Sequence, residues 1–547
     1  MAPRRTTRRT TTKAKRQPAA PRPRIKSAKA QQEPQSTTAE RLGALIKSAR
    51  DTMRKDKGLS TDLDRLPMLT WIMFLKFLDD MEELEASRAK LAGQRYRPTI
   101  DSPYRWRDWA AQEDGITGPE LLAFISQEEV AGPDGTKRAG LLPYLRGLSN
   151  GNGHISRRRV VAAVFKDVTN RMISGYLLRE VINKVNAIHF LSAEELFTLG
   201  HLYESMLKEM RDAAGENGEF YTPRPVVRFM VDMIDPRLGE TILDPAAGTG
   251  GFLAQAFMHL EKQVKTVQDR KILHHETLFG GEAKPLPYLL CQMNLLLHGF
   301  ENPQISPDNS LAVKLTSIGD KDRVDIILTN PPFGGEEERG ILANFPEGKQ
   351  TSETALLFLQ LIMRRLKRQP HPGRAAIVVP NGTLFGDGVA ARIKEQLLKE
   401  FHLHTIIRLP NGVFSPYTPI PTNLVFFDRS GPTEAVWFYE LPLPEGRKNY
   451  TKTKPIQYED FMACIEWFTA AARTPNEHAW LVPVADILQY DEDGAVLSAN
   501  LDQRNPNKSA EITHRPPKDL IEDILGAERQ IIQALNDLEQ RLPEPQE

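Results

Sequence analysis

The stretch Asp244-Pro245-Ala246-Ala247-Gly248-Thr249-Gly250-Gly251-Phe252 follows a short apolar run and opens an apolar helical pattern. It therefore predicts a strand, a glycine turn and a helix in succession. Its three glycines allow positive φ angles and a close approach of the backbone to a ligand. Their spacing is not the GxGxxG of a nicotinamide site, and no Lys-Ser or Lys-Thr pair follows, as a phosphate-cradling P-loop would require.

Apolar runs on both sides of this turn predict a parallel-centred, doubly wound sheet. The runs do not alternate with polar residues, which is typical of strands buried on both faces, and helical patterns separate several of them. The predicted strands are 241–243, 277–279, 324–328, 375–379, 403–407, 423–427 and 435–439. The predicted helices are 224–234, 251–263, 284–298, 353–367 and 390–400. The fold class is thus α/β and Rossmann-like.

The residues around the turn predict a cofactor with a ribose, an adenine and an amino-acid tail but no phosphates, which fits S-adenosylmethionine. Asp244 can take the ammonium of the methionine part. Glu282, just after the second strand, is placed to accept both ribose hydroxyls, although a carboxylate capping a helix is the alternative. Asp308 or Asn309, after a third strand, can bond the adenine amine, and a plain turn is the alternative there. The predicted contacts within the turn are Ala246, Gly248, Thr249, Gly250 and Gly251.

A loop upstream of the first sheet helix carries Glu219-Phe220-Tyr221-Thr222-Pro223-Arg224. Thr222 is a good helix N-cap and Pro223 a good first-turn residue. The functional interpretation is that this loop closes over the cofactor.

The second decisive stretch, Asn330-Pro331-Pro332-Phe333, ends a buried strand downstream of the glycine turn. An exocyclic amine is a weak nucleophile, and acceptors for both of its N–H bonds turn its lone pair toward the methyl donor. Asn330 Oδ1 and the Pro331 carbonyl can be these acceptors, and the two prolines make them rigid. Phe333 offers a stacking face for a base that has left the duplex. These residues predict an amino-group methyltransferase acting on adenine in DNA.

Composition and charge fit a multidomain enzyme. The chain has 547 residues, 40% of them hydrophobic and 26% charged, and its two cysteines are too few for a thiolate zinc site. We expect no metal, no transmembrane helix and a cytoplasmic location. Residues 1–32 carry 11 Lys and Arg and no acid, which leaves 60 basic and 71 acidic side chains elsewhere, a net of about −11.

Four segments are expected along the chain. Residues 1–38 are a basic tail that lacks the apolar side chains needed for a core. Residues 39–195 form a helical domain, residues 196–480 the methyltransferase domain, and residues 481–547 a C-terminal extension. The extension contains an amphipathic helix after Pro516-Pro517, which either docks within the chain or pairs with a partner subunit.

These motifs, in this order, resemble the modification subunit of type I restriction–modification systems, within the N6-adenine DNA methyltransferase family. The resemblance spans residues 40–540. Its matching pieces are residues 219–224, 244–252, 280–282, 294–299, 325–334, 373–382 and 409–414. The basic tail has no counterpart in it.

The resemblance implies that Asn330, Pro331 and Phe333 bind the flipped adenine. It also implies that residues 219–224, 249–251 and Glu282 contact S-adenosylmethionine. Two such subunits would join one specificity subunit on double-stranded DNA, and a separate motor-nuclease subunit would cleave. No helicase-type P-loop and no spare segment of about 150 residues for target recognition is evident.

Three alternatives stay open. A protein glutamine methyltransferase uses a similar Asn-Pro-Pro signature, but typically with Tyr where this chain has Phe333. A DNA adenine methyltransferase with its own specificity is the second. A non-catalytic scaffold that has kept the fold is the third, and intact Asn330, Asp244 and Glu282 argue against it.

Overall fold

The computed structural model describes residues 38–131, 136–149, 157–190, 193–214, 221–300, 303–334 and 337–507, with residues 525, 528–529 and 532–533 in addition. The basic segment 1–37 lies outside the described residues. So does the amphipathic helix expected after Pro517, apart from those few isolated positions.

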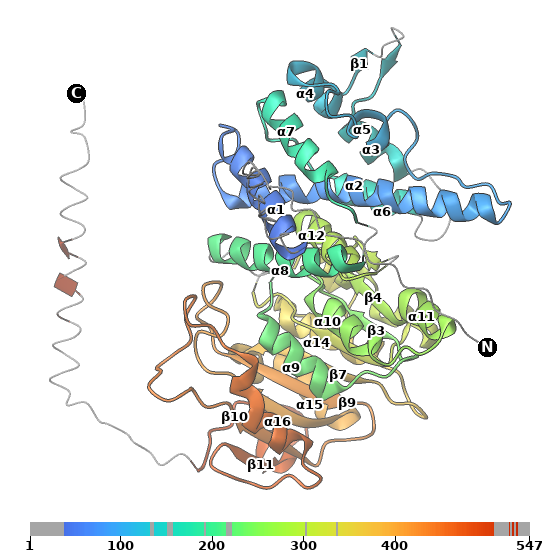
Figure 1. Ribbon diagram of the computed structural model, residues 1–547. Helices are drawn as coiled ribbons and strands as arrows, with labels where there is room; N and C mark the ends of the chain where they lie inside the picture. Colours follow the sequence, from blue (N-terminus) through green and yellow to red (C-terminus); the bar gives the residue numbers. More distant parts are fainter. Residues whose placement is uncertain are drawn as a thin grey trace, which may run out of the picture.

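A helical part forms the top of the molecule in Figure 1. Its longest helix, α2, begins after Thr61, whose backbone N–H bonds to the Asp64 carboxylate in a capping box, and buries residues 66–78 almost without a break. The helices are α1 (Thr38–Arg54), α2 (Asp62–Leu91), α3 (Trp106–Trp109), α4 (Gly118–Ser126), α5 (Leu141–Arg146), α6 (Arg157–Phe165), α7 (Gly175–Asn186) and α8 (Ala193–Ala214). A two-residue ladder between β1 (Val130–Ala131) and β2 (Lys137–Arg138) interrupts them.

The lower part is built on a nine-stranded sheet in the order β11-β10-β8-β9-β7-β6-β3-β4-β5. Its strands are β3 (Ile242–Asp244), β4 (Leu278–Gly281), β5 (Gln304–Ser306), β6 (Ile326–Thr329), β7 (Arg374–Pro380), β8 (His402–Arg408), β9 (Thr422–Asp428), β10 (Ala435–Glu440) and β11 (Ala479–Pro483). Strands β5, β4, β3, β6 and β7 run parallel, and β8 and β10 pair in parallel. Strand β9 is antiparallel and lies between β7 and β8.

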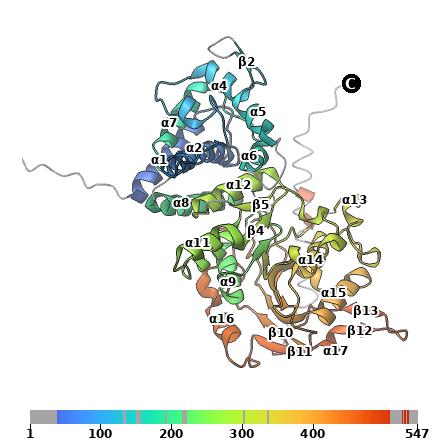
Figure 2. The same cartoon turned by 90° about the vertical axis from the view of Figure 1, so that its right-hand side faces the viewer.

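Helices cover both faces of the sheet, as Figure 2 shows with α9 and α16 on one side and α14 and α15 on the other. Neighbouring strand residues enter different cores. Ile326 and Leu328 join the core shared with α9 and α10, whereas Ile327 joins the core under α14 and α15. The helices are α9 (Arg224–Ile234), α10 (Gly251–Glu261), α11 (Val267–Ile272), α12 (Pro285–Leu297), α13 (Arg339–Leu342), α14 (Thr354–Arg365), α15 (Val389–Glu400), α16 (Met462–Thr469) and α17 (Val484–Ile487).

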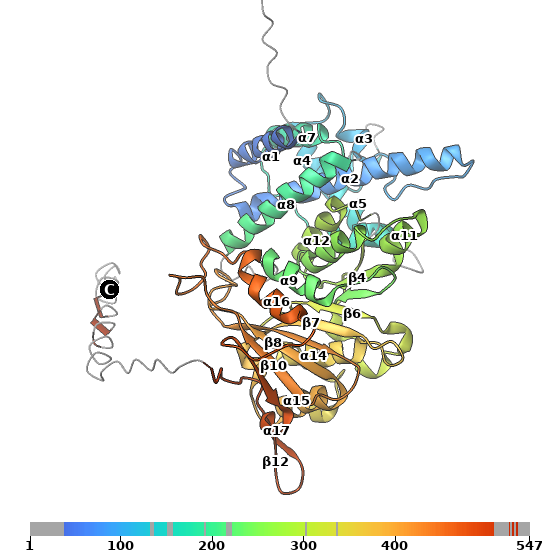
Figure 3. The same cartoon turned by 60° about the horizontal axis from the view of Figure 1, so that its bottom comes forward.

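Two features cross the expected domain limits. Helix α8 spans residue 195 and packs against α1, α2 and α12. Strand β11 spans residue 480 and pairs antiparallel with β10. After it, the hairpin of β12 (Leu488–Tyr490) and β13 (Val496–Ala499) packs through β13 on α15 and projects from the lower end of the sheet in Figure 3.

Each of the seven predicted strands and five predicted helices is present within a few residues of its expected bounds, so the predicted doubly wound α/β fold is confirmed. In the described part of the chain, no helix is long and apolar enough to cross a membrane.

Candidate active site at the carboxyl ends of the central strands

The glycine turn joins β3 to α10 with two residues in the left-handed region. Gly248 has φ 54° and Gly250 φ 75°. A Cβ on Gly250 would lie 2.9 Å from Cys291 Sγ, and one on Gly251 would lie 2.0 Å from Arg224 Nη1. The turn therefore requires glycine both for its backbone conformation and for its close packing.

Asp244 ends β3 and is 1% exposed. The Thr329 hydroxyl donates to its Oδ1 at 2.7 Å and the Ala246 N–H to the same oxygen at 3.1 Å. Its Oδ2 receives no hydrogen bond among the described residues. Burial raises the pKa of Asp244 to about 7, outweighing those two bonds, and the nearby Glu282 carboxylate adds to the rise.

Glu282 follows β4 and reaches back to the turn. The Gly248 N–H donates to its Oε2 at 2.9 Å and the Lys284 N–H to its Oε1 at 2.8 Å. Burial raises the pKa of Glu282 to about 6 against the effect of these bonds. The carboxylate thus joins the glycine turn to Lys284, the residue before α12. The start of α12 has no side-chain cap bond among the described residues, so the helix-capping alternative is wrong.

Arg224, at the first position of α9, ties the turn to the helical part. It forms a bidentate pair with Glu204 of α8 at 2.7 and 3.0 Å and donates to Thr249 Oγ1 at 3.2 Å. Asn294 of α12 donates from Nδ2 to both Glu204 Oε1 at 2.9 Å and the Thr249 carbonyl at 2.8 Å. Arg224 also lies over the ring of Tyr221, 4.2 Å from its centroid. These contacts fix the backbone of the turn from three helices.

Asn330 follows β6, the strand beside β3. Its Nδ2 donates to Thr222 Oγ1 at 3.0 Å. Its Oδ1 is buried and has no hydrogen-bond partner among the described residues. Such an atom is costly, because a buried acceptor normally has a donor. The free oxygen therefore marks the place where a ligand N–H fits.

Phe333 stands beside two aromatic residues of the β8–β9 connection. Its ring centroid is 5.4 Å from that of Phe414 and 5.8 Å from that of Tyr417. With Pro331 and Pro332, these rings place an apolar wall next to the free Asn330 oxygen. A planar heterocycle has stacking surfaces there.

The loop after β5 contacts the turn through a residue that the sequence did not single out. The Ser310 hydroxyl donates to the Pro245 carbonyl at 2.7 Å. Asn309 uses its side-chain oxygen to accept from the Leu311 N–H at 2.9 Å, as in a plain turn. Asp308 is exposed and accepts from Ser306 at 2.8 Å and from Arg159 of α6 at 3.3 Å. This loop lies at the carboxyl end of β5, at the sheet edge where the sequence predicts the cofactor. The bonds observed for Asp308 and Asn309 are all to other residues of the chain.

Glu219 and Phe220 lie outside the described residues. The rest of that loop is present, but α9 begins after Pro223, and its start has no side-chain cap bond. Thr222 is therefore not the N-cap that its sequence context suggested. Its hydroxyl meets Asn330 instead.

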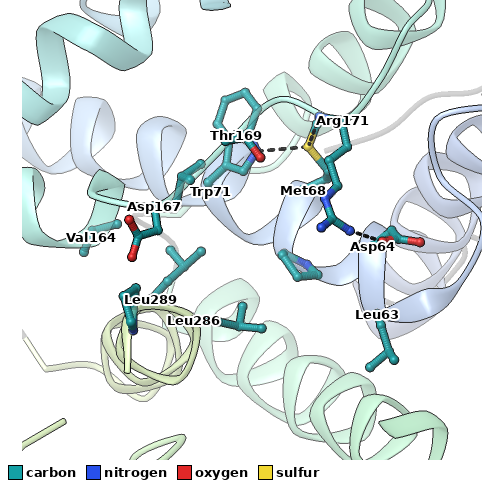
Figure 4. A pocket seen from close by; sticks show the side chains of 13 residues that line it. Leu63, Asp64, Met68, Trp71, Val164, Asp167, Thr169, Arg171, Leu286 and Leu289 are labelled. Carbon is teal, nitrogen blue, oxygen red and sulfur yellow. Dashed lines mark hydrogen bonds and ion pairs between the residues drawn. The ribbon is translucent and has the colours of Figure 1, made fainter. Parts of the chain in front are cut away.

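An apolar cavity of about 240 Å³ lies elsewhere, between α2, the α6–α7 connection and the first turn of α12 (Figure 4). Trp71, Leu286 and Leu289 line it, and Arg171 pairs with Asp64 at its rim. It includes neither carboxylate of the turn nor Asn330. Among the described residues, no three His, Cys, Asp or Glu side chains gather as a metal site would require.

The donor set fits S-adenosylmethionine. Asp244 and Glu282 are buried and have raised pKa values, and no cation lies beside either carboxylate in the part of the chain that the structure describes. A bound ammonium and ribose hydroxyls would therefore stabilise their charged forms. The glycine backbone between them offers no phosphate-binding lysine. Asn330 follows β6, the strand that pairs with β3.

Comparison with known proteins agrees with this geometry. The family model described as N-6 DNA Methylase matches residues 195–504, and the HsdM N-terminal domain model matches residues 42–185. The chain belongs to the N-6 DNA methylase family. The EcoEI type I restriction enzyme methylase subunit of Escherichia coli is 48% identical over 482 residues, 87% of this chain and 92% of its own length.

Solved structures extend the likeness to the whole fold. A crystal structure described as a modification subunit of a type I restriction enzyme from Vibrio vulnificus YJ016 is 62% identical, with a TM-score of 0.76, covering 88% of this chain and all of the other. A chain from a study of type I restriction–modification complex assembly is 38% identical, with a TM-score of 0.75, covering 92% of this chain and 99% of the other. The predicted family, fold and enzyme class are confirmed.

Several residues of the site were not predicted. Glu204 lies within an ordinary helical pattern, and only the fold brings it to Arg224. Thr329 looks like any strand residue, and Tyr417 follows the family motif that ends at Phe414. Asn294 lies in a segment that matches the family, residues 294–299, but nothing in the sequence indicates that its side-chain amide donates to the glycine turn.

Proposed function

We propose that this chain transfers a methyl group from S-adenosylmethionine to N6 of an adenine flipped out of double-stranded DNA. The free, buried Oδ1 of Asn330 carries the proposal. It accepts one N–H of the adenine amine, and the Pro331 carbonyl accepts the other. The nitrogen lone pair then points toward the methyl donor, and the rigid acceptors need little reorganisation.

The cofactor is held by the edge formed by β3 and β4. Asp244 takes the ammonium through Oδ2, Glu282 takes the ribose hydroxyls, and the glycine turn of residues 248–251 lies along the ligand. Residues 219–224 cover it. When bound, S-adenosylmethionine supplies an electrophilic methyl group on a sulfonium. No strong general base is required of the chain, because the amine loses its proton after transfer.

The substrate base is held by Phe333, with Phe414 and Tyr417 completing the aromatic wall. Asp308 or Asn309 contacts the cofactor adenine. Because Asn309 Oδ1 already accepts from Leu311 N–H, the exposed carboxylate of Asp308 is the more available group.

We further propose that the chain is the modification subunit of a type I complex. A specificity subunit supplies target recognition, a second copy of this chain completes the methyltransferase, and a motor-nuclease subunit is a further partner. The similarity to the EcoEI methylase subunit, over 92% of that protein, supports this assignment. The division into a helical domain (39–195), a methyltransferase domain (196–480) and an extension for partner docking (481–547) belongs to the same proposal, as does a cytoplasmic location.

The test is base-resolved mapping of N6-methyladenine in host DNA. Cells carry the native chain, Asn330→Ala, or the control Asn449→Ala, which changes an exposed asparagine in the connection between β10 and α16. We expect methylation at one two-part, gapped sequence in the native and control cells and none with Asn330→Ala. Loss at a short continuous site would indicate a self-sufficient enzyme. An unchanged methylome would contradict DNA methylation and direct attention to protein glutamine as substrate.

A further inference from the structure

Thr222 lies between Asn330 and the residues that hold the glycine turn. Thr222 is 8% exposed, and its Oγ1 accepts the Asn330 Nδ2–H at 3.0 Å. Its own carbonyl accepts from Arg224 Nη1 at 3.1 Å. Arg224 is in turn held by Glu204 and bonds to Thr249 of the glycine turn. The residue is therefore anchored through its backbone to the cofactor side and through its side chain to Asn330.

The Thr222 hydroxyl can accept or donate, and here it accepts from the Nδ2 end of the Asn330 amide, which leaves the other end for the substrate. The two ends of the amide have nearly the same shape, but only the oxygen can accept an amine N–H. With Nδ2 engaged by Thr222, Oδ1 is left buried and unpaired. In the opposite orientation, the amide would present its own N–H groups to the adenine amine, and two donors would face each other.

The start of α9 shows that this hydroxyl serves no helix cap. Pro223 occupies the capping position, and the described residues provide no side-chain cap bond there. A threonine before a helix ordinarily caps it through this same oxygen. Here, the oxygen points across to the strand end of β6, 108 residues later in the chain.

We propose that Thr222 is a positioning residue for methyl transfer, whose hydroxyl fixes the Asn330 amide so that Oδ1 faces the adenine amine. The inference rests on the proposed function and goes beyond a cofactor contact. It separates two roles for one loop, in which the backbone of residues 221–224 covers the cofactor and the Thr222 side chain orients the group that binds the base.

The experiment measures single-turnover methylation of target DNA by the assembled methyltransferase at saturating S-adenosylmethionine and DNA. Thr222→Val keeps the shape of the side chain and removes the hydroxyl, and Thr222→Ser keeps the hydroxyl and removes the methyl group. We expect the rate constant to fall about 10-fold in Thr222→Val, the loss of one hydrogen bond to a buried group, and to stay within about 2-fold in Thr222→Ser. The KM for S-adenosylmethionine should be unchanged in both.

A second pair of variants tests whether Thr222 acts through the amide. Asn330→Asp carries two oxygens, so it has no wrong orientation. In that background, adding Thr222→Val should cost less than about 2-fold. The comparison also covers the case in which Thr222→Val lowers stability, because that loss would occur in both the native and the Asn330→Asp backgrounds and thermal unfolding measures it.

Three outcomes would overturn the inference. They are an unchanged rate in Thr222→Val, a raised KM for S-adenosylmethionine with an unchanged saturated rate, or the same 10-fold loss in the Asn330→Asp background. A native enzyme that forms no N6-methyladenine would instead contradict the proposed function itself. The two failures are therefore distinguishable.

Discussion

Asp244→Asn should stabilise the cofactor-free protein while weakening its cofactor site. The wild-type carboxylate ionises at an ordinary pKa of 3.8 in the unfolded chain and at about 7 in the folded one, where burial opposes its charge. That difference corresponds to at most about 4 kcal/mol, at 1.36 kcal/mol for each pKa unit. The substituted amide keeps an oxygen for Thr329 and Ala246, so the two existing hydrogen bonds survive.

Because the pKa of Asp244 is higher in the folded state than in the unfolded state, the stability of the wild type depends on pH. Between pH 4 and pH 7 the folded state holds a proton on Asp244 that the unfolded state has released, so wild-type stability falls as pH rises and levels off above about pH 7. Asp244→Asn lacks this slope. The variant's advantage therefore grows from pH 5 to pH 7 and is constant beyond, reaching on the order of 10 °C in the unfolding midpoint at most.

Thermal unfolding of both proteins at pH 5, 6, 7 and 8, without and with S-adenosylmethionine, provides the assay. Added cofactor at 100 times its Kd stabilises the wild type by about 2.7 kcal/mol, and a tenfold loss of affinity in the variant removes about half of that. A variant that is no more stable at pH 8, or whose advantage is the same at every pH, would refute the reasoning about Asp244.

Three further changes test other parts of the site. Arg224→Met leaves the mostly buried Glu204 without its cation and should lower the free energy of unfolding by about 3–5 kcal/mol, whereas Arg237→Met, at an exposed pair, should change it little in the same denaturant titration. Gly251→Ala brings a Cβ within 2.0 Å of Arg224 Nη1 and should weaken cofactor binding in calorimetry, whereas Gly334→Ala, with nothing within 4 Å, should not. Cofactor affinity should rise from pH 5 to pH 7 as Glu282, whose pKa is about 6, ionises, and a Glu282→Gln variant that keeps the full slope would contradict this assignment.

The sequence alone was sufficient to predict the strands that are buried along nearly their whole length. Strands β6, β7 and β9 are buried at nearly every position, so their apolar runs were visible. The strands whose bounds were not predicted carry a weaker pattern. In β5 only Ile305 is buried, and in β11 at the sheet edge buried and exposed positions are mixed over five residues. Short edge strands depend on pairing with a neighbour, which no local pattern records.

For the site, the sequence located the groups but not their connections. The positions of Asp244, Glu282 and Asn330 at strand ends followed from the motifs. That Glu204 pairs with Arg224, or that Thr222 meets Asn330 rather than capping its helix, depends on how α8, α9 and β6 lie in space. Segment 337–352, which follows the Asn330 motif, anchors Phe345 in a small core with Leu311 and Leu357.

The antiparallel strand β9 has a consequence for how this enzyme can be altered. Because β9 returns directly beside β8, the aromatic wall of Phe414 and Tyr417 is carried by a hairpin connection rather than by a crossover helix. Residues can be inserted into or removed from a hairpin loop without shifting a helix layer or the register of a parallel strand. The wall that Phe414 and Tyr417 add to the proposed base pocket can therefore be exchanged between relatives by loop grafting, whereas the part built on β3, β4 and β6 must be kept as a unit.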